Sequence, residues 1–173
     1  MKREPVDLSV LVLEVLDIFL ARVSEKLNAL WSDFDPAIHF LVLADGTELR
    51  NVLVELIENA WKFTDQGEII LTVRLLGPSE ESAEIEFSVE DTGQGMAPEI
   101  IARLAEGTDA NKSGQSLQIP EAQPESDPNA ESGLIVSRKT IASMGGAMRI
   151  ANQRGRGTIA RFTIPFEKAV VGA

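Results

Sequence analysis

The chain of 173 residues carries a formal net charge of −11, which argues against nucleic acid or an anionic membrane surface as its main partner. It has no cysteine and one histidine, which excludes disulfides and thiolate chemistry and makes a Cys/His zinc site untenable. Because 44% of its residues are hydrophobic, it can bury a sizeable core, and we expect one domain over residues 1–173. The apolar run 10–20 is interrupted by Glu14 and Asp17, so we expect a soluble, cytoplasmic chain without membrane contact.

The first half of the chain predicts a helix, two strands and a second helix. Residues 1–5 are polar and are expected to be loose. Apolar spacing and β-forming residues then predict, in order, a helix over 10–27, strands over 28–34 and 38–43, and a helix that begins near Asp45 and ends before Gln66-Gly67.

The second half predicts two further pairs of strands, separated by helices and a long polar segment. The expected elements are a hairpin of strands over 68–76 and 83–90, a short helix over 98–104, a polar segment over 106–132, a helix over 133–144, and strands over 147–152 and 158–165. A polar segment of that length in a compact domain is usually a functional lid or disordered. The order of elements predicts a two-layer α/β sandwich, with helices on one face of a mixed, largely antiparallel sheet.

The predicted helix over residues 49–64 carries an apolar stripe with a polar edge beside it. Glu55, Asn59 and Lys62 stand at i, i+4 and i+7, so a carboxylate, an amide and an ammonium share that edge. The edge of a buried face excludes some water but keeps access, which suits groups that meet a ligand. An amphipathic core helix with ordinary boundary polar residues is the alternative from this pattern alone.

Three glycine-containing segments are candidate parts of the same site. Asp91-Thr92-Gly93-Gln94-Gly95 follows a strand, where the glycines let the backbone approach a flat ligand and a buried carboxylate can accept from an exocyclic amine. Gly155-Arg156-Gly157-Thr158 precedes the last strand and alone would be a hairpin turn. Gly133-Leu134 stands at a predicted helix start, where free N–H groups can meet phosphate oxygens.

Together, in this order and spacing, these segments resemble the catalytic, ATP-binding domain of sensor histidine kinases. The wider group includes gyrase, chaperone and mismatch-repair ATPases. The stretch 55–64 is similar to the asparagine box, and 91–95 looks like the first glycine box. Gly133-Leu134 falls at the second glycine box, and 155–158 resembles the last one. The resemblance implies a Bergerat-type ATP-binding fold with its core over about 5–166 and an ATP lid over about 106–132.

The resemblance also implies a role for each residue of the boxes. Asn59 would hold Mg²⁺, with Glu55 as a base or a further partner of the metal. Asp91 would bind the adenine amino group, and Lys62 would approach the phosphates. The remaining positions would complete the ATP site: Gly93 and Gly95 against the base, Gly157 and Thr158 behind the adenine, and Gly133 with Leu134 on the phosphates.

Two positions depart from the family pattern. Most histidine kinases have asparagine at the position of Glu55, whereas ATP-hydrolysing relatives have glutamate there, so a self-contained ATPase is a third interpretation. The second glycine box keeps only Gly133, and Glu131 replaces another glycine. The lid segment is also acidic, and like charges close to a triphosphate cost on the order of 1–4 kcal/mol. We therefore expect a mobile lid and weak ATP binding.

The only histidine, His39, lies in a predicted strand and has no acidic residue after it, so it does not match a phosphoacceptor motif. The sequence therefore predicts a kinase domain that phosphorylates a histidine on a separate dimerisation module, and through it serves a response regulator. Such a chain is either an excised domain or acts in trans. The alternative is a degenerate domain that regulates a partner by contact.

Overall fold

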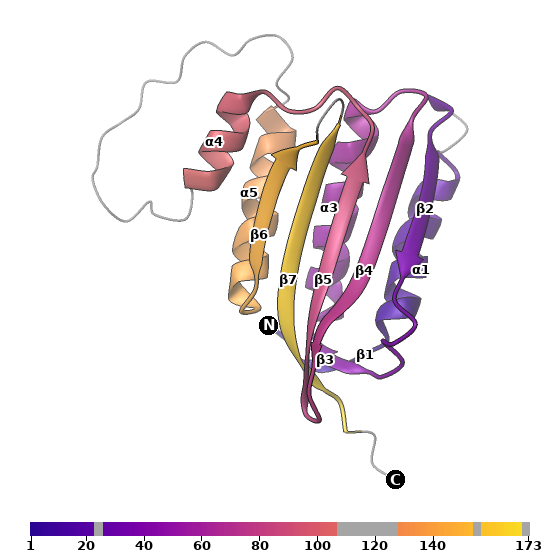
Figure 1. Cartoon of the computed structure of the whole chain (residues 1–173), viewed down its shortest axis with the longest axis vertical. Coiled ribbons are helices and arrows are strands. Elements are labelled where there is room, and N and C mark those ends of the chain that lie inside the picture. Colours follow the sequence, from indigo (N-terminus) through magenta and orange to yellow (C-terminus); the bar gives the residue numbers. More distant parts are fainter. Residues whose placement is uncertain (23–25, 107–127, 154–156, 171–173) are drawn as a thin grey trace.

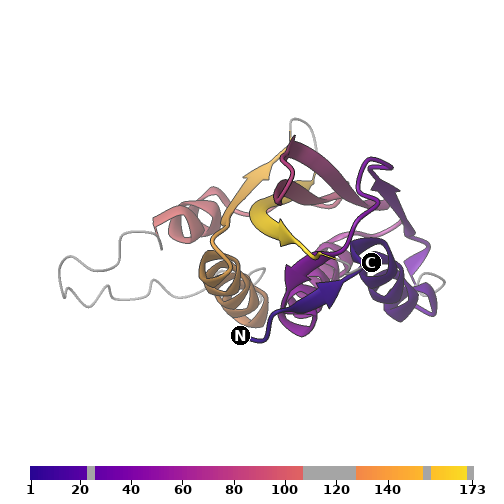
Figure 2. The same cartoon turned by 90° about the horizontal axis from the view of Figure 1, so that it is seen from below.

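The computed structural model describes residues 1–22, 26–106, 128–153 and 157–170. One mixed sheet forms the first layer, and α1, α3 and α5 lie side by side on one face of it (Figures 1 and 2). The predicted two-layer α/β sandwich is confirmed. No helix in the described ranges is long and apolar enough to cross a bilayer.

The sheet is antiparallel except at one edge. Its strands are β1 (Glu4–Val6), β2 (Ala29–Phe34), β3 (Val42–Ala44), β4 (Glu68–Pro78), β5 (Ser82–Asp91), β6 (Ala147–Asn152) and β7 (Thr158–Lys168). They are ordered β1-β3-β7-β5-β4-β2, and β6 also pairs with β7. The edge strand β2 runs parallel to β4, with Trp31 opposite Ile70.

The helices begin and end where local chemistry favours it. They are α1 (Leu8–Leu20), α3 (Gly46–Phe63), α4 (Pro98–Glu106) and α5 (Pro128–Ser143). Asp45 caps α3, because its side chain accepts a hydrogen bond from the Glu48 N–H at 3.1 Å. Asp7 caps α1 in the same way.

The core lies between the sheet and the helices. Side chains alternate along β5 and β7, so Ile85 and Phe87 of β5 and Phe162 of β7 all point inward and are buried. The rings of Phe87 and Phe162 stack with centroids 4.9 Å apart. The apolar stripe of α3 packs onto this face, and burying each such side chain contributes about 1.5–3 kcal/mol. The same alternation carries Asp91, the last residue of β5, to the inward face.

Several predicted boundaries were wrong. Glu4 and Pro5 were expected to be loose but form β1 together with Val6. The predicted strand over 38–43 is replaced by the shorter β3. The first helix starts at Leu8 and ends at Leu20, short of the predicted residue 27. His39 is exposed and lies outside any strand, in the connection between β2 and β3.

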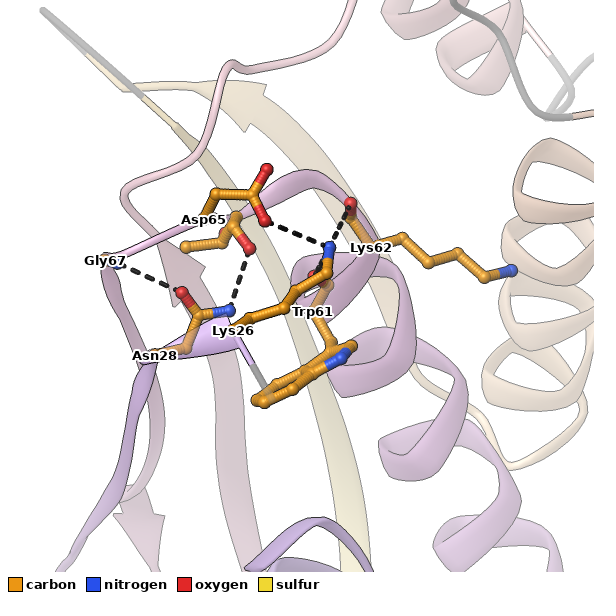
Figure 3. A network of polar contacts seen from close by, with 7 residues as sticks. Lys26, Asn28, Trp61, Lys62, Asp65 and Gly67 are labelled. Carbon is orange, nitrogen blue, oxygen red and sulfur yellow. Dashed lines mark hydrogen bonds and ion pairs between the residues drawn. The ribbon is translucent and has the colours of Figure 1, made fainter. Parts of the chain in front are cut away.

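A polar cluster joins the end of α3 to the start of β2 (Figure 3). Buried Asn28 donates to the Thr64 carbonyl at 2.8 Å and accepts from the Gly67 N–H at 3.0 Å. The Ala29 N–H donates to the Gly67 carbonyl at 2.8 Å. One asparagine thus supplies partners for both ends of the turn between α3 and β4.

We expect Asn28→Ala to destabilise the fold by about 2–3 kcal/mol, because it leaves two backbone groups unpaired in a buried place. The free energy of unfolding by urea measures the loss. Asn152 is an exposed counterpart that bonds both the N–H and the carbonyl of Met96. Asn152→Ala should cost less than about 1 kcal/mol, since water can replace its bonds. Equal losses in the two variants would contradict the role of burial.

Candidate functional site

The polar edge of α3 holds two of the three predicted residues together. The Asn59 side chain is only 4% exposed, and its Nδ2 donates to Glu55 Oε1 at 3.3 Å. The Asn59 Oδ1 atom is buried, and no hydrogen bond to it is found among the described residues. Lys62 is exposed one turn further on. An amide oxygen buried without a donor costs free energy, which is a reason to look for a ligand there.

Glu55 also meets α5. A Cβ atom placed on Gly133 would overlap the Glu55 carboxylate, so a side chain at this position would force the flexible Glu55 side chain to move. The helix containing Gly133 starts at Pro128, several residues earlier than predicted. Gly133 is therefore inside the helix, where its N–H belongs to the helical ladder, so the predicted helix start at Gly133 was wrong. The contact of Gly133 and Leu134 with ATP stays a prediction.

Asp91 is the buried carboxylate of the site, with an exposed fraction of 7%. Its Oδ1 accepts from the Gly93 N–H at 2.9 Å and from the Thr158 N–H at 3.3 Å. Burial raises the pKa of the Asp91 carboxyl above its ordinary value of 3.8, and these two hydrogen bonds act in the opposite direction. The register places Asp91 beside the start of β7, so the sheet itself brings Asp91 and Thr158 together.

Two glycines, Gly157 and Gly93, let the neighbouring backbone segments lie close to Asp91. Gly157 has φ of +90°, and a Cβ there would overlap the Asp91 carbonyl. A Cβ on Gly93 would overlap the Phe63 carbonyl at the end of α3. Gly95 lies in the same loop, next to Asn152. The predicted segments around Asp91 and Thr158 thus meet in space, while Gly155 and Arg156 lie outside the described residues.

A cavity lies between these elements, lined among others by Leu56, Asn59, Asp91, Met96, Leu134 and Thr158. Its volume is about 20 Å³, enough for about one water molecule. Leu134 of α5 is 2% exposed and is one of the apolar residues that line this cavity. A flat aromatic ligand beside Asp91 therefore needs the cavity to widen.

A larger depression lies on the other side of Glu55. It measures about 340 Å³ and runs between α3 and α5, lined among others by Glu48, Asn51, Glu55, Ser132, Val136 and Thr140. Glu55 thus lines this depression, while Asn59, to which it is hydrogen-bonded, lines the smaller cavity beside Asp91.

The predicted lid falls mostly outside the described residues, at 107–127. Its two flanks are described. Arg103 of α4 pairs with Glu131 in the first turn of α5, with Nε and Oε1 3.2 Å apart. Arg103 thus partly compensates the negative charge of Glu131. The sequence did not indicate this ion pair.

Asn152 was also missed. Its side chain accepts from the Met96 N–H at 2.9 Å and donates to the Met96 carbonyl at 2.7 Å, so it fixes the chain just after Gly95. An asparagine at the end of a strand, close to a glycine-rich turn, is the signal that could have indicated it.

No cluster of three or more acidic, histidine or cysteine side chains suited to a metal exists within the described residues. The Asn59 Oδ1 and the Glu55 carboxylate, which accepts from the Asn59 Nδ2, still offer oxygen ligands. Mg²⁺ prefers oxygen, keeps several waters and is often held by one or two side chains plus phosphates. This pair of residues therefore fits Mg²⁺ that is bound together with a phosphate ligand.

Comparison with known proteins identifies the class. Residues 44–168 match the family model of the histidine kinase-, DNA gyrase B- and HSP90-like ATPases, and the chain belongs to this family. Within it, the chain is a histidine kinase-type ATPase domain. It is 28% identical over 158 residues to hybrid signal transduction histidine kinase B of Dictyostelium discoideum, covering 89% of this chain but 8% of that kinase.

Solved structures of histidine kinases have the same fold as this chain. The fold matches full-length ShkA in complex with AMPPNP, with a TM-score of 0.75 and 29% identity, over 98% of this chain and 32% of ShkA. It matches the nucleotide-free catalytic domain of histidine kinase ThkA, with a TM-score of 0.73 and 22% identity, over 95% and 96% of the two chains. ThkA in complex with the response regulator TrrA matches with a TM-score of 0.65 and 19% identity, over 94% of this chain and 41% of that one.

Proposed function

We propose that residues 1–173 form the ATP-binding catalytic domain of a two-component sensor histidine kinase, which transfers the γ-phosphoryl group of Mg-ATP to a histidine on a separate dimerisation module. The observation that carries the proposal is the Asn59 Oδ1, a buried acceptor without a described donor. It belongs to a side chain that donates to Glu55 and lines the cavity beside Asp91. The complex of ShkA with AMPPNP supports ATP as the ligand.

Recognition of the base falls to Asp91. In its ionised form the carboxylate only accepts hydrogen bonds, and it can therefore take one from the exocyclic amine of adenine. The N–H groups of Gly93 and Thr158 hold its Oδ1 and fix its orientation. Gly93, Gly95 and Gly157 allow the backbone to lie close to the base.

Glu55, Asn59 and Lys62 serve the phosphates. Bound Mg²⁺ would neutralise charge on the phosphate oxygens. Asn59 would supply its buried Oδ1 to the metal and Lys62 its ammonium to the phosphates. Glu55, held by the Asn59 amide, faces the open depression and could accept a proton or contact a water of the metal. Such catalysis comes mainly from positioning and charge.

The partner follows from the same proposal. The chain supplies the ATP site, and a His-containing dimerisation module, in the same parent protein or in trans, supplies the acceptor. ThkA in complex with TrrA supports a response regulator as the next protein in the relay. We propose that this takes place in the cytoplasm.

A second candidate function is a non-catalytic domain that regulates a partner by contact. The observation that favours it is the small volume of the Asp91 cavity, which Leu134 helps to fill.

Calorimetric titration with ATP, with and without Mg²⁺, decides between the two candidates. We expect binding that Mg²⁺ strengthens, and the absence of any heat of binding up to millimolar ATP would favour the non-catalytic domain. We also expect no phosphohistidine on the isolated chain after incubation with radiolabelled ATP, because His39 is followed by Phe40 and not by an acidic residue, and so does not match a phosphoacceptor motif. Label on His39 would contradict the need for a partner module.

A further inference from the structure

Lys26 occupies the C-terminal end of α3. Its Nζ donates to the carbonyls of Trp61 and Lys62, each at 3.2 Å (Figure 3). The last carbonyls of a helix lack partners within the helix, and a cation there also interacts favourably with the helix dipole. Figure 3 shows the Lys62 side chain extending away from this cluster. Lys26 therefore binds the backbone of the turn from which Lys62 projects.

The same turn supports the loop after Asp91. The Gln94 N–H donates to the Phe63 carbonyl at 3.3 Å. Gly93 lies so close to the Phe63 carbonyl and the Thr64 hydroxyl that a Cβ would overlap the first and press on the second. With this little clearance, a shift of the last turn of α3 must move the Gly93–Gln94 backbone as well.

Other contacts of Lys26 do not explain its placement. Its ion pair with Asp65 has a separation of 3.3 Å, but the Asp65 side chain is 78% exposed, and pairs of that kind contribute little. Lys26 itself is only 32% exposed, and its two carbonyl acceptors come from one helix end. The structural effect of its ammonium is thus directed at α3.

We propose that Lys26 is a positioning residue for the nucleotide site. It does not contact the ligand. It holds the last turn of α3, and through the Phe63 carbonyl and the Lys62 backbone it sets the geometry of both the Asp91 loop and the phosphate-binding ammonium. The proposal rests on the proposed nucleotide-binding function, and Lys26 lies outside the segments that resemble the family motifs.

The test compares Lys26→Met with a matched loss of charge elsewhere. Lys168 donates to the Ser79 carbonyl and lies over the Phe40 ring. It is the last residue of β7, beside the start of β5, and is therefore roughly 30 Å from Asp91 at the other end of β5. We expect Lys26→Met to weaken ADP binding roughly tenfold in calorimetry, and Lys168→Met to leave it within about twofold. Lys26→Arg should restore binding to within about threefold of the parent, since a guanidinium can also donate to two carbonyls.

A second measurement needs no nucleotide. Amide hydrogen exchange of Gln94, followed by NMR, reports its bond to the Phe63 carbonyl. We expect faster exchange in Lys26→Met than in Lys168→Met, at a temperature where both variants are folded. Equal Gln94 exchange in the two variants overturns the positioning role, whether or not nucleotide binds. If the parent chain binds no ADP, the proposed function fails, and the exchange rates alone decide the role of Lys26.

Discussion

Asn59→Ala is expected to abolish the strengthening of ATP binding by Mg²⁺. The substitution removes the buried Oδ1 that faces no described donor, and with it the side-chain oxygen proposed for the metal. Titrations of ATP with Mg²⁺ and with EDTA measure the effect as the ratio of the two dissociation constants. We expect a ratio near one in the variant.

The fold should survive this substitution. Alanine is the best helix former, and the change removes an acceptor whose burial without a partner costs roughly 1–3 kcal/mol. Asn51→Ala is the matched control, because Asn51 is an exposed asparagine on the same helix. A Mg²⁺ effect that persists in Asn59→Ala, or that is also lost in Asn51→Ala, would contradict the role of Asn59.

Asp91→Asn is expected to weaken binding of ADP and of adenosine by about 1.5–3 kcal/mol, more than tenfold in affinity. The amide oxygen can still accept from the Gly93 and Thr158 N–H groups, but its NH₂ then meets the exocyclic amine, donor against donor. Asp33→Asn removes the same charge from an exposed residue paired with Arg74 and should leave affinity unchanged. Equal affinity in parent and Asp91→Asn would place adenine elsewhere.

We expect Asp91→Asn to raise the stability of the ligand-free fold at pH 7, although it weakens nucleotide binding. Burial raises the pKa of the Asp91 carboxyl in the folded state. Protonation of Asp91 therefore stabilises the fold. This stabilisation is fully present below the pKa of the unfolded chain, about 3.8, and is lost as the pH rises through the pKa of the folded state. At pH 7 the parent therefore carries a buried charge that Asp91→Asn lacks. We expect the ligand-free variant to melt at a higher temperature than the parent at pH 7, and the difference to shrink as the pH approaches 3.8. A variant that melts below the parent at pH 7 would contradict this sign.

The periodic patterns of residues 49–64 and of the last strands predicted the buried faces of these elements correctly. The stripe on residues 49–64 becomes the buried face of α3, and Asp45 caps it as its position before Glu48 indicated. The alternation in β5 and β7 likewise fixes which side chains face inward, and it brings Asp91 next to Thr158. Local periodicity was enough here because one face of each element is buried.

Prediction failed where the decisive partner is distant in sequence. Strand β1 is three residues long, and it exists because it pairs with β3 some forty residues later. The first turn of α5 starts at Pro128, a residue suited to the first helical position, and Glu131 in that turn finds Arg103 on the other side of the lid segment. No sequence pattern within residues 4–6 or within residues 128–131 indicates these contacts. The same holds for Lys26, whose acceptors are on another helix.

The contact between Glu55 and Gly133 has a consequence for how such a domain can change over generations. The carboxylate fills the space that any side chain at position 133 would need. A larger residue at 133 therefore requires that the Glu55 carboxylate turn away, that residue 55 be shorter, or that α3 and α5 move apart. A side chain gained at 133 would thus displace the Glu55 carboxylate, so a redesign of the chemistry at Glu55 has to include the helix that packs against it.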